Sequence, residues 1–420
     1  MFYRQSVLPN GIRILTEELP SVRSIALGLW FRVGSRDEEA ATSGISHFME
    51  HMIFKGTDTR SAVDISTEFE SLGAEYNAFT SKEYTCFYAR FVDDKLPRVL
   101  DILADITCHP AFRQEDIDSE REVVLEEIAR SEDSPDDYVF DLFTQALIPD
   151  HSMGWRVLGD AERVASFMHQ DFVDYHSLHY CGENLVVSAA GNLDHDTLVA
   201  LCEKVFANVP AGKPVKRSEC IATGGEHHRF LQKDTEQAHI VYGMPSLSAK
   251  DPDRFALQLL SCALGGGMSS RLFLEIREKR GLAYAVQCDC ANCTDVGSFL
   301  IYTGTRPANV ATVLEIFQNE MEKLREGGLT QEELDRNRDF ITGQLLLGME
   351  GTRARMNRLG RTAVMGNPLR SIDEVLQEYN AVSLEDIDRV IAKLLDTPST
   401  LTIISPYSDE ELERMSEGLR

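Results

Sequence analysis

The sequence repeats one pattern of strands and helices after roughly 215 residues, which is about half of its 420 residues. In each half, apolar runs with strand character alternate with amphipathic helical stretches. Because both element types are mixed and several strands form hairpin-like pairs, the pattern favours the α+β class. We therefore predict two homologous domains, each with a mixed or antiparallel sheet. The matching segments are residues 25–30 and 240–244, 84–91 and 297–303, 96–108 and 310–325, and 115–127 and 332–344.

A segment rich in proline and glycine separates the two halves. It covers residues 209–226 and contains Pro210, Gly212, Pro214, Gly224 and Gly225. Such a composition is typical of an interdomain linker. We therefore expect a first domain at residues 1–215 and a second domain at residues 216–420.

The pentapeptide His47-Phe48-Met49-Glu50-His51 is the strongest indication of chemistry in the sequence. Two histidines four residues apart lie on one face of a helix, so both imidazoles can reach one metal ion. A glutamate in that turn can accept a proton from a metal-bound water without being a ligand, in the H-x-x-E-H order of some zinc peptidases. The motif predicts His47 and His51 as zinc ligands and Glu50 as the general base. The alternative is a pair of surface histidines on an acidic helix.

A helix predicted at residues 115–131 offers the third protein ligand that a catalytic zinc ion needs. Its apolar residues define an inward face, and Glu120 and Glu127 fall near that face, whereas Glu126 points to solvent. Because a carboxylate directed at the core needs a partner, we predict Glu127 as the ligand. Glu120 would orient a histidine ligand. The alternative is that both carboxylates bond to water or arginine.

Together these residues resemble the M16, or pitrilysin-like, zinc metallopeptidases, and the resemblance covers nearly the whole chain. It is closest to the short two-domain branch that includes the β-subunit of the mitochondrial processing peptidase. The zinc motif matches through His47, Glu50 and His51, and the later helix matches through Glu120 and Glu127. Further matches are Asn77, Ala78 and Phe79 of a substrate-binding edge strand, Gly265, Gly266 and Gly267 of a glycine-rich loop, and Arg277 and Tyr284, which contact substrate in the family.

The resemblance implies a fold, a reaction and an assembly. Each domain is expected to be a sheet with helices packed on one face. An extended peptide would add to the edge strand, and Arg277 and Tyr284 would clamp it. Family members of this length close two chains around a chamber, which implies a homodimer with Arg277 and Tyr284 supplied in trans. The second half has no H-x-x-E-H motif and has Gln344 where the first has Glu127, so we expect it to serve binding or structure.

The glycine-rich stretch also has simpler interpretations. Three consecutive glycines without a following Gly-Lys-Ser/Thr do not form a phosphate loop, and they would equally suit a flexible connection between helices. Likewise, Arg277 would pair with a nearby acid and Tyr284 would pack, if neither met substrate.

Composition excludes several classes of protein. A net charge of −26 argues against nucleic-acid binding. The sequence has no run of about 18 apolar residues, so we expect no membrane span. Residues 1–6 resemble neither a signal peptide nor a transit peptide. We therefore expect a cytoplasmic, bacterial protein, with the mature form of an organellar protein as the alternative.

The sequence thus predicts a zinc-dependent endopeptidase with one Zn²⁺ per chain, acting on extended peptides or unfolded segments inside a dimeric chamber. A non-catalytic scaffold or peptide-binding subunit, like the core proteins of a respiratory complex, is the alternative. The complete set of His47, Glu50, His51 and Glu127 argues against it. An amide hydrolase acting on small molecules is a further alternative.

Overall fold

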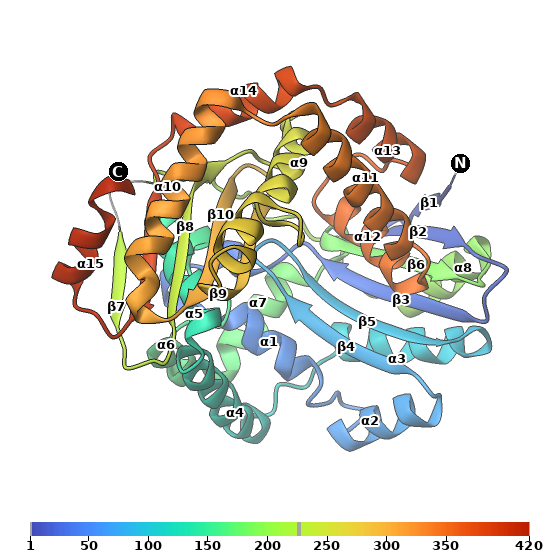
Figure 1. Cartoon of the computed structure of the whole chain (residues 1–420). Helices are drawn as coiled ribbons and strands as arrows, with labels where there is room; N and C mark the ends of the chain where they lie inside the picture. Colours follow the sequence, from blue (N-terminus) through green and yellow to red (C-terminus); the bar gives the residue numbers. More distant parts are fainter. Residues whose placement is uncertain (1, 225–227, 420) are drawn as a thin grey trace. The chain divides into compact units, whose positions relative to one another are not determined.

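A computed structural model describes residues 2–224 and 228–419 of the chain (Figure 1). The chain divides into two compact units, and each unit combines segments from both halves of the sequence. The predicted domains at residues 1–215 and 216–420 are contiguous in sequence. In the structure, residues 130–154 of the first half belong to the second unit, and residues 347–371 of the second half belong to the first unit. The first unit holds Met1–Ala129, Trp155–Ser218 and Leu347–Ser371, and the second holds Arg130–Gly154, Glu219–Leu346 and Ile372–Arg420.

The first unit is built on a sheet of six strands, in the order β1-β2-β6-β3-β5-β4. Strand β2 runs parallel to β6, and the other neighbouring pairs are antiparallel. Strand β4 is the last in the order, so it lies at an edge of the sheet. The strands are β1 (Arg4–Val7), β2 (Arg13–Glu18), β3 (Ser24–Phe31), β4 (Glu75–Thr80), β5 (Thr85–Val92) and β6 (Leu185–Gly191).

The second unit repeats this topology in a sheet of five strands, in the order β7-β11-β8-β10-β9. Strand β7 runs parallel to β11, as β2 runs parallel to β6, and the remaining pairs are antiparallel. This correspondence confirms the prediction of an α+β fold with two similar halves. The strands are β7 (Arg229–Gln232), β8 (Ala238–Ser246), β9 (Ala283–Asn292), β10 (Gly297–Thr305) and β11 (Thr400–Ser405).

Each sheet packs one face against a large apolar core. In the first unit, helices α1 (Ile45–Ile53) and α3 (Leu96–Cys108) contribute to this core. In the second unit, the corresponding core includes α9 (Arg254–Gly265), α10 (Val310–Gly327) and α14 (Leu384–Leu395). Because sheet residues alternate between faces, these helices bury only half of the apolar side chains of each sheet.

The opposite face of each sheet is covered by a single helix from the other half of the sequence. Helix α12 (Thr352–Val364) packs on β3 and β6 (Figure 1), and α5 (Pro135–Leu147) packs on β8 and β11. A side chain at Gly360 of α12 would bring its Cβ within 2.1 Å of Trp30 Nε1, so only glycine permits this approach. The expectation of helices on one face is therefore incomplete, because each sheet has two apolar faces to bury.

The remaining helices add buried residues to the same two cores. They are α2 (Ala62–Ser71), α4 (Gln114–Glu132), α6 (Ala161–Ser166), α7 (His169–His179), α8 (His195–Val205), α11 (Gln331–Gly348), α13 (Ile372–Ala381) and α15 (Asp409–Ser416). The predicted linker, residues 209–226, has neither helix nor strand in its described part, and residues 225–226 lie outside the described residues. None of the helices in the described part of the chain has the length and apolar character needed to cross a bilayer.

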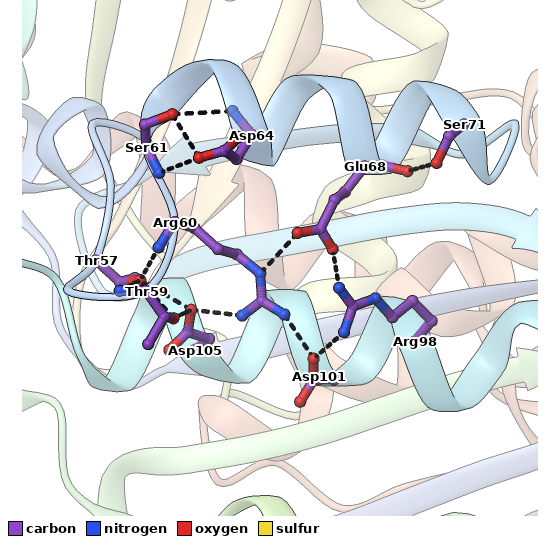
Figure 2. A network of polar contacts seen from close by, with 10 residues as sticks. All are labelled: Thr57, Thr59, Arg60, Ser61, Asp64, Glu68, Ser71, Arg98, Asp101 and Asp105. Carbon is purple, nitrogen blue, oxygen red and sulfur yellow. Dashed lines mark hydrogen bonds and ion pairs between the residues drawn. The ribbon is translucent and has the colours of Figure 1, made fainter.

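A network of charged side chains fixes the loop that follows α1 against α3 (Figure 2). Arg60 binds Asp101 at 2.7 Å and Asp105 at 2.5 Å, both on α3, and Glu68 on α2 at 3.1 Å. Arg98 binds Asp101 from α3 itself. Networks of partly buried charges hold geometry better than single exposed pairs. The network therefore restrains the chain where it leaves α1, the helix that carries the H-x-x-E-H motif.

Candidate metal centre

A buried carboxylate holds the start of helix α1. Glu38 accepts the backbone N–H of Gly44 at 2.9 Å and that of Ser46 at 2.8 Å. These N–H groups belong to the first turn, where a helix favours negative charge. Burial raises the pKa of Glu38 to about 7, against the opposing effect of its hydrogen bonds to Ser46 and Gly44. Glu38 thus anchors the segment that positions the motif.

Three potential ligands converge beside α1. The Nε2 atom of His51 lies 3.4 Å from Glu127 Oε2, and that of His47 lies 3.7 Å from the same oxygen. One ligand atom from each of the three residues lies within 4.8 Å of the others. The two histidines come from α1, whereas Glu127 comes from α4, 76 residues further along the chain.

Glu120 holds one of these histidines in place from behind. The Nδ1 atom of His51 lies 2.8 Å from Glu120 Oε1. A neutral His51 that donates its Nδ1–H to this oxygen would present the lone pair of Nε2 on the side of Glu127. Glu120 also binds Lys55. Although burial opposes ionisation, hydrogen bonds from His51 and Lys55 lower the pKa of Glu120. It therefore stays ionised as an acceptor for His51.

The donor set of the cluster fits a divalent cation. Burial, together with the charge of His51, lowers the pKa of His47, so this imidazole is neutral and can act as a ligand. Burial also opposes the charging of His51, but hydrogen bonds to Glu120 and Glu127 raise its pKa. Two imidazoles and a carboxylate are a donor set that zinc prefers. The arrangement thus offers zinc the three protein ligands of a catalytic site.

Glu50 lies on the same helix but outside this ligand group. Its carboxylate accepts a hydrogen bond from the hydroxyl of Thr80 at 2.6 Å. Burial raises the pKa of Glu50, and the hydrogen bond from Thr80 acts against that shift. A half-buried carboxylate with a raised pKa is suited to accept and return a proton.

The predicted substrate-binding residues Asn77, Ala78 and Phe79 lie on β4. This strand pairs with β5, and its other edge pairs with none of the described strands. Ala78 is buried in the core, and Phe79 contacts Trp30 edge to face at 5.6 Å. Since these two side chains pack within the unit, a peptide would meet mainly the free backbone groups of β4.

The remaining predicted residues belong to the second unit. Gly265 ends α9, where an added Cβ would lie 2.4 Å from the backbone nitrogen of Cys288. Close packing alone therefore requires glycine at this position. Gly266 and Gly267 follow it directly in the chain, and Gly267 has room for a side chain, because the nearest atom to an added Cβ would be 3.7 Å away. A role for the three glycines in substrate binding stays a prediction.

Arg277 and Tyr284 contact each other. Arg277 lies in a π-helical turn, Phe273–Glu278, and its guanidinium stacks 4.4 Å from the centre of the Tyr284 ring. It also donates to the Tyr284 carbonyl at 2.9 Å. The Tyr284 residue is 79% exposed, so it does not pack in the core. The alternative of a packed tyrosine and an acid-paired arginine thus does not describe this unit.

Comparison with known proteins decides the family. Residues 13–161 match the family described as "Insulinase (Peptidase family M16)", and residues 166–340 match "Peptidase M16 inactive domain". A protein of Streptomyces coelicolor named as an uncharacterized zinc protease is 40% identical over 423 residues, covering 99% of this chain and 92% of that protein. The chain belongs to the M16 peptidase family.

Other M16 proteins support the same assignment. An uncharacterized zinc protease of Bacillus subtilis is 39% identical over 404 residues, covering 94% of this chain and 97% of that protein. The crystal structure of a protease from Helicobacter pylori has a TM-score of 0.90 at 25% identity and covers 96% of this chain and 99% of its own. A Pseudomonas fluorescens structure described as a peptidase M16 inactive domain has the same TM-score at 21% identity, covering 97% and 99%, and it shows the fold alone.

The sequence did not indicate three residues of this M16 site. Glu38 and Lys55 precede and follow the motif, and their contacts depend on how the chain folds back. The sequence could have indicated Thr80, because this residue lies two positions beyond Ala78 on the same face of a predicted strand. Its partner, Glu50, is 30 residues away in sequence, and strand alternation alone does not identify such a partner.

Proposed function

We propose that this M16 protein is a zinc-dependent endopeptidase that cleaves extended peptides or unfolded polypeptide segments. One observation carries the proposal: His47, His51 and Glu127 offer ligand atoms within 4.8 Å of one another, and Glu50 lies on the same helix outside this group. The donor set supports one Zn²⁺ per chain, held by these three residues. When bound, the ion supplies a Lewis acid that activates water and polarises a carbonyl group.

The residues around the ion have distinct tasks in this proposal. Glu50 accepts a proton from the attacking water and later delivers it to the leaving amine. Its position on the helix of the two histidines, outside the ligand group, suits both transfers. Glu120 keeps the His51 ring oriented by accepting its Nδ1–H. Removing Glu50 should therefore abolish turnover without removing a metal ligand.

The substrate in this proposal is an extended chain that adds to the free edge of β4. Pairing through backbone groups recognises shape more than sequence, so selectivity would be broad. We further propose a homodimer that encloses a chamber, in which Arg277 and Tyr284 of one chain contact the peptide bound by its partner. The 79% exposure of Tyr284 supports its availability to a ligand.

The experiment compares the wild-type protein with Glu50→Gln, both loaded with zinc, on a mixed library of internally quenched peptides. Glu126→Gln is the matched control, because Glu126 is an exposed glutamate directly beside Glu127. We expect cleavage by the wild type and the control, and a loss of about 100-fold to 10,000-fold in Glu50→Gln. Equal cleavage by all three would contradict the role of Glu50. Cleavage by none would favour a non-catalytic peptide-binding protein.

A further inference from the structure

The Glu50 carboxylate is held by a residue outside the H-x-x-E-H motif. Thr80 donates its hydroxyl proton to Glu50 Oε2 at 2.6 Å, and the backbone N–H of Thr80 also favours the ionised carboxylate. In the described part of the chain, the Thr80 hydroxyl makes the one hydrogen bond to this carboxylate. A carboxylate has two oxygens, so engaging Oε2 leaves Oε1 available for another partner.

Thr80 is itself fixed by the sheet. It is the last residue of β4 and pairs with Thr85 of β5. Thr85 is fully buried, and its hydroxyl donates to the Val33 carbonyl at 2.9 Å and lies 3.5 Å from the Thr80 hydroxyl. A hydroxyl that is held by a paired strand loses little further freedom when it binds a carboxylate. The Thr80 hydroxyl therefore contacts Glu50 from a rigid strand rather than from a mobile loop.

We propose that Thr80 is a positioning residue for the general base: its hydroxyl selects one orientation of Glu50 and ties that orientation to the end of the edge strand. This inference rests on the proposed peptidase function. The same strand, β4, would pair with the substrate, so the bound peptide and the residue that holds the base would share one rigid strand.

The kinetic test uses Thr80→Val, which keeps the shape of the side chain, and Thr80→Ser, which keeps the hydroxyl. With zinc content verified as equal to wild type, Thr80→Val should lower kcat at least about tenfold and leave KM within about twofold, whereas Thr80→Ser should restore most of kcat. A rise in KM alone would assign Thr80 to peptide binding and overturn the proposal. So would an equal loss of kcat in both variants, because that loss would not depend on the hydroxyl.

A second measurement does not depend on activity. The melting temperatures of wild type, Thr80→Val, Glu50→Ala and the double variant form a thermodynamic cycle. If the hydroxyl holds Glu50, the change in melting temperature of the double variant differs from the sum of the two single changes. If it equals that sum, the proposed role of Thr80 is overturned. If wild type cleaves no peptide, the proposed function fails, and the cycle still decides whether Thr80 holds Glu50.

Discussion

The two units have the same architecture, but among the described residues the group that could hold a metal ion lies in the first unit. Helix α1 presents His47, Glu50 and His51 beside its sheet, whereas the corresponding helix α9 buries ten of its 12 residues and has no histidine. The partner helix differs in the same way, because Glu120 and Glu127 of α4 correspond to Asn337 and Gln344 of α11. The second unit thus forms the same sheet order without the residues that we propose as metal ligands.

The largest effect should come from removing a proposed ligand in the first unit. In Glu127→Gln, peptide cleavage should fall more than about 1,000-fold, because the charge stabilisation by the ion is lost. The counterpart change in the second unit, Gln344→Glu, should leave activity and metal content unchanged. Zinc per chain, measured by mass spectrometry, and initial cleavage rates check both. Full activity in Glu127→Gln would mean that the metal centre lies elsewhere.

The two covering helices allow a matched test of stability. Leu359 on α12 and Leu147 on α5 are both buried, and each leucine-to-alanine change should lower the free energy of unfolding by about 2–5 kcal/mol. Hydrogen exchange identifies which unit opens. Leu359→Ala should speed exchange in β3 and β6, and Leu147→Ala in β8 and β11. Uniform acceleration in both variants would show that the units unfold as one.

Glu120 and its counterpart Asn337 allow a test of zinc affinity with a smaller expected effect. Glu120→Gln should weaken zinc binding by about 10-fold to 100-fold, because the negative partner of His51 is lost. Asn337→Ala removes a hydrogen bond to the Glu333 carbonyl, so it should lower the melting temperature and leave zinc affinity unchanged. Competition with a fluorescent chelator measures both affinities. Equal affinity in all three proteins would remove Glu120 from the metal centre.

The smallest effect concerns an ion-pair cluster in the second unit. Asp253 binds Arg389 and Lys393 of α14, and these partners, led by Arg389, lower its pKa to about 2. A depressed pKa in the folded state adds stability above pH 4, and that stability is lost as the pH falls from about 4 to about 2. Asp253→Asn should therefore cost on the order of 1 kcal/mol at pH 7, because solvent screens the half-exposed partners.

The measurement for Asp253 is chemical unfolding at a series of pH values. The free energy of unfolding should differ less and less between wild type and Asp253→Asn as the pH approaches 2. Asp58→Asn, at an exposed aspartate of the first unit, is the matched control for the substitution itself. A difference that stays constant down to pH 2 would show that lost packing, rather than charge, explains the cost.

Much of the fold could be predicted because its signals are local. The helix predicted at residues 96–108 is α3, and the helix predicted at residues 115–131 is α4, Gln114–Glu132. Its phase predicted the buried Glu120 and the exposed Glu126, although Val123, expected to face inward, is 49% exposed. A period of 3.6 residues thus orients most of a long helix. The chain brings the predicted ligands together, and their role as ligands stays a prediction.

What could not be predicted depends on contacts between distant segments. No local signal shows that α5 leaves its own half to cover β8 and β11, because an amphipathic helix does not specify which apolar face it meets. The same holds for Thr80, whose hydroxyl reaches Glu50 only once β4 has paired with β5. Sequence periodicity predicts which face of a helix or strand is apolar. The segment that packs on that face depends on the whole fold.

The exchange of α5 and α12 between the two halves resembles the exchange of helices in a domain-swapped dimer. Two identical halves that each give one helix to the other form a domain-swapped dimer, and joining the two copies end to end gives the arrangement found here. A half expressed alone would leave the sheet face around Trp30 and Tyr88 without its cover. It would bind a second copy of itself through that face. Each half therefore supplies the helix that covers the sheet of the other, including the half that has no H-x-x-E-H motif.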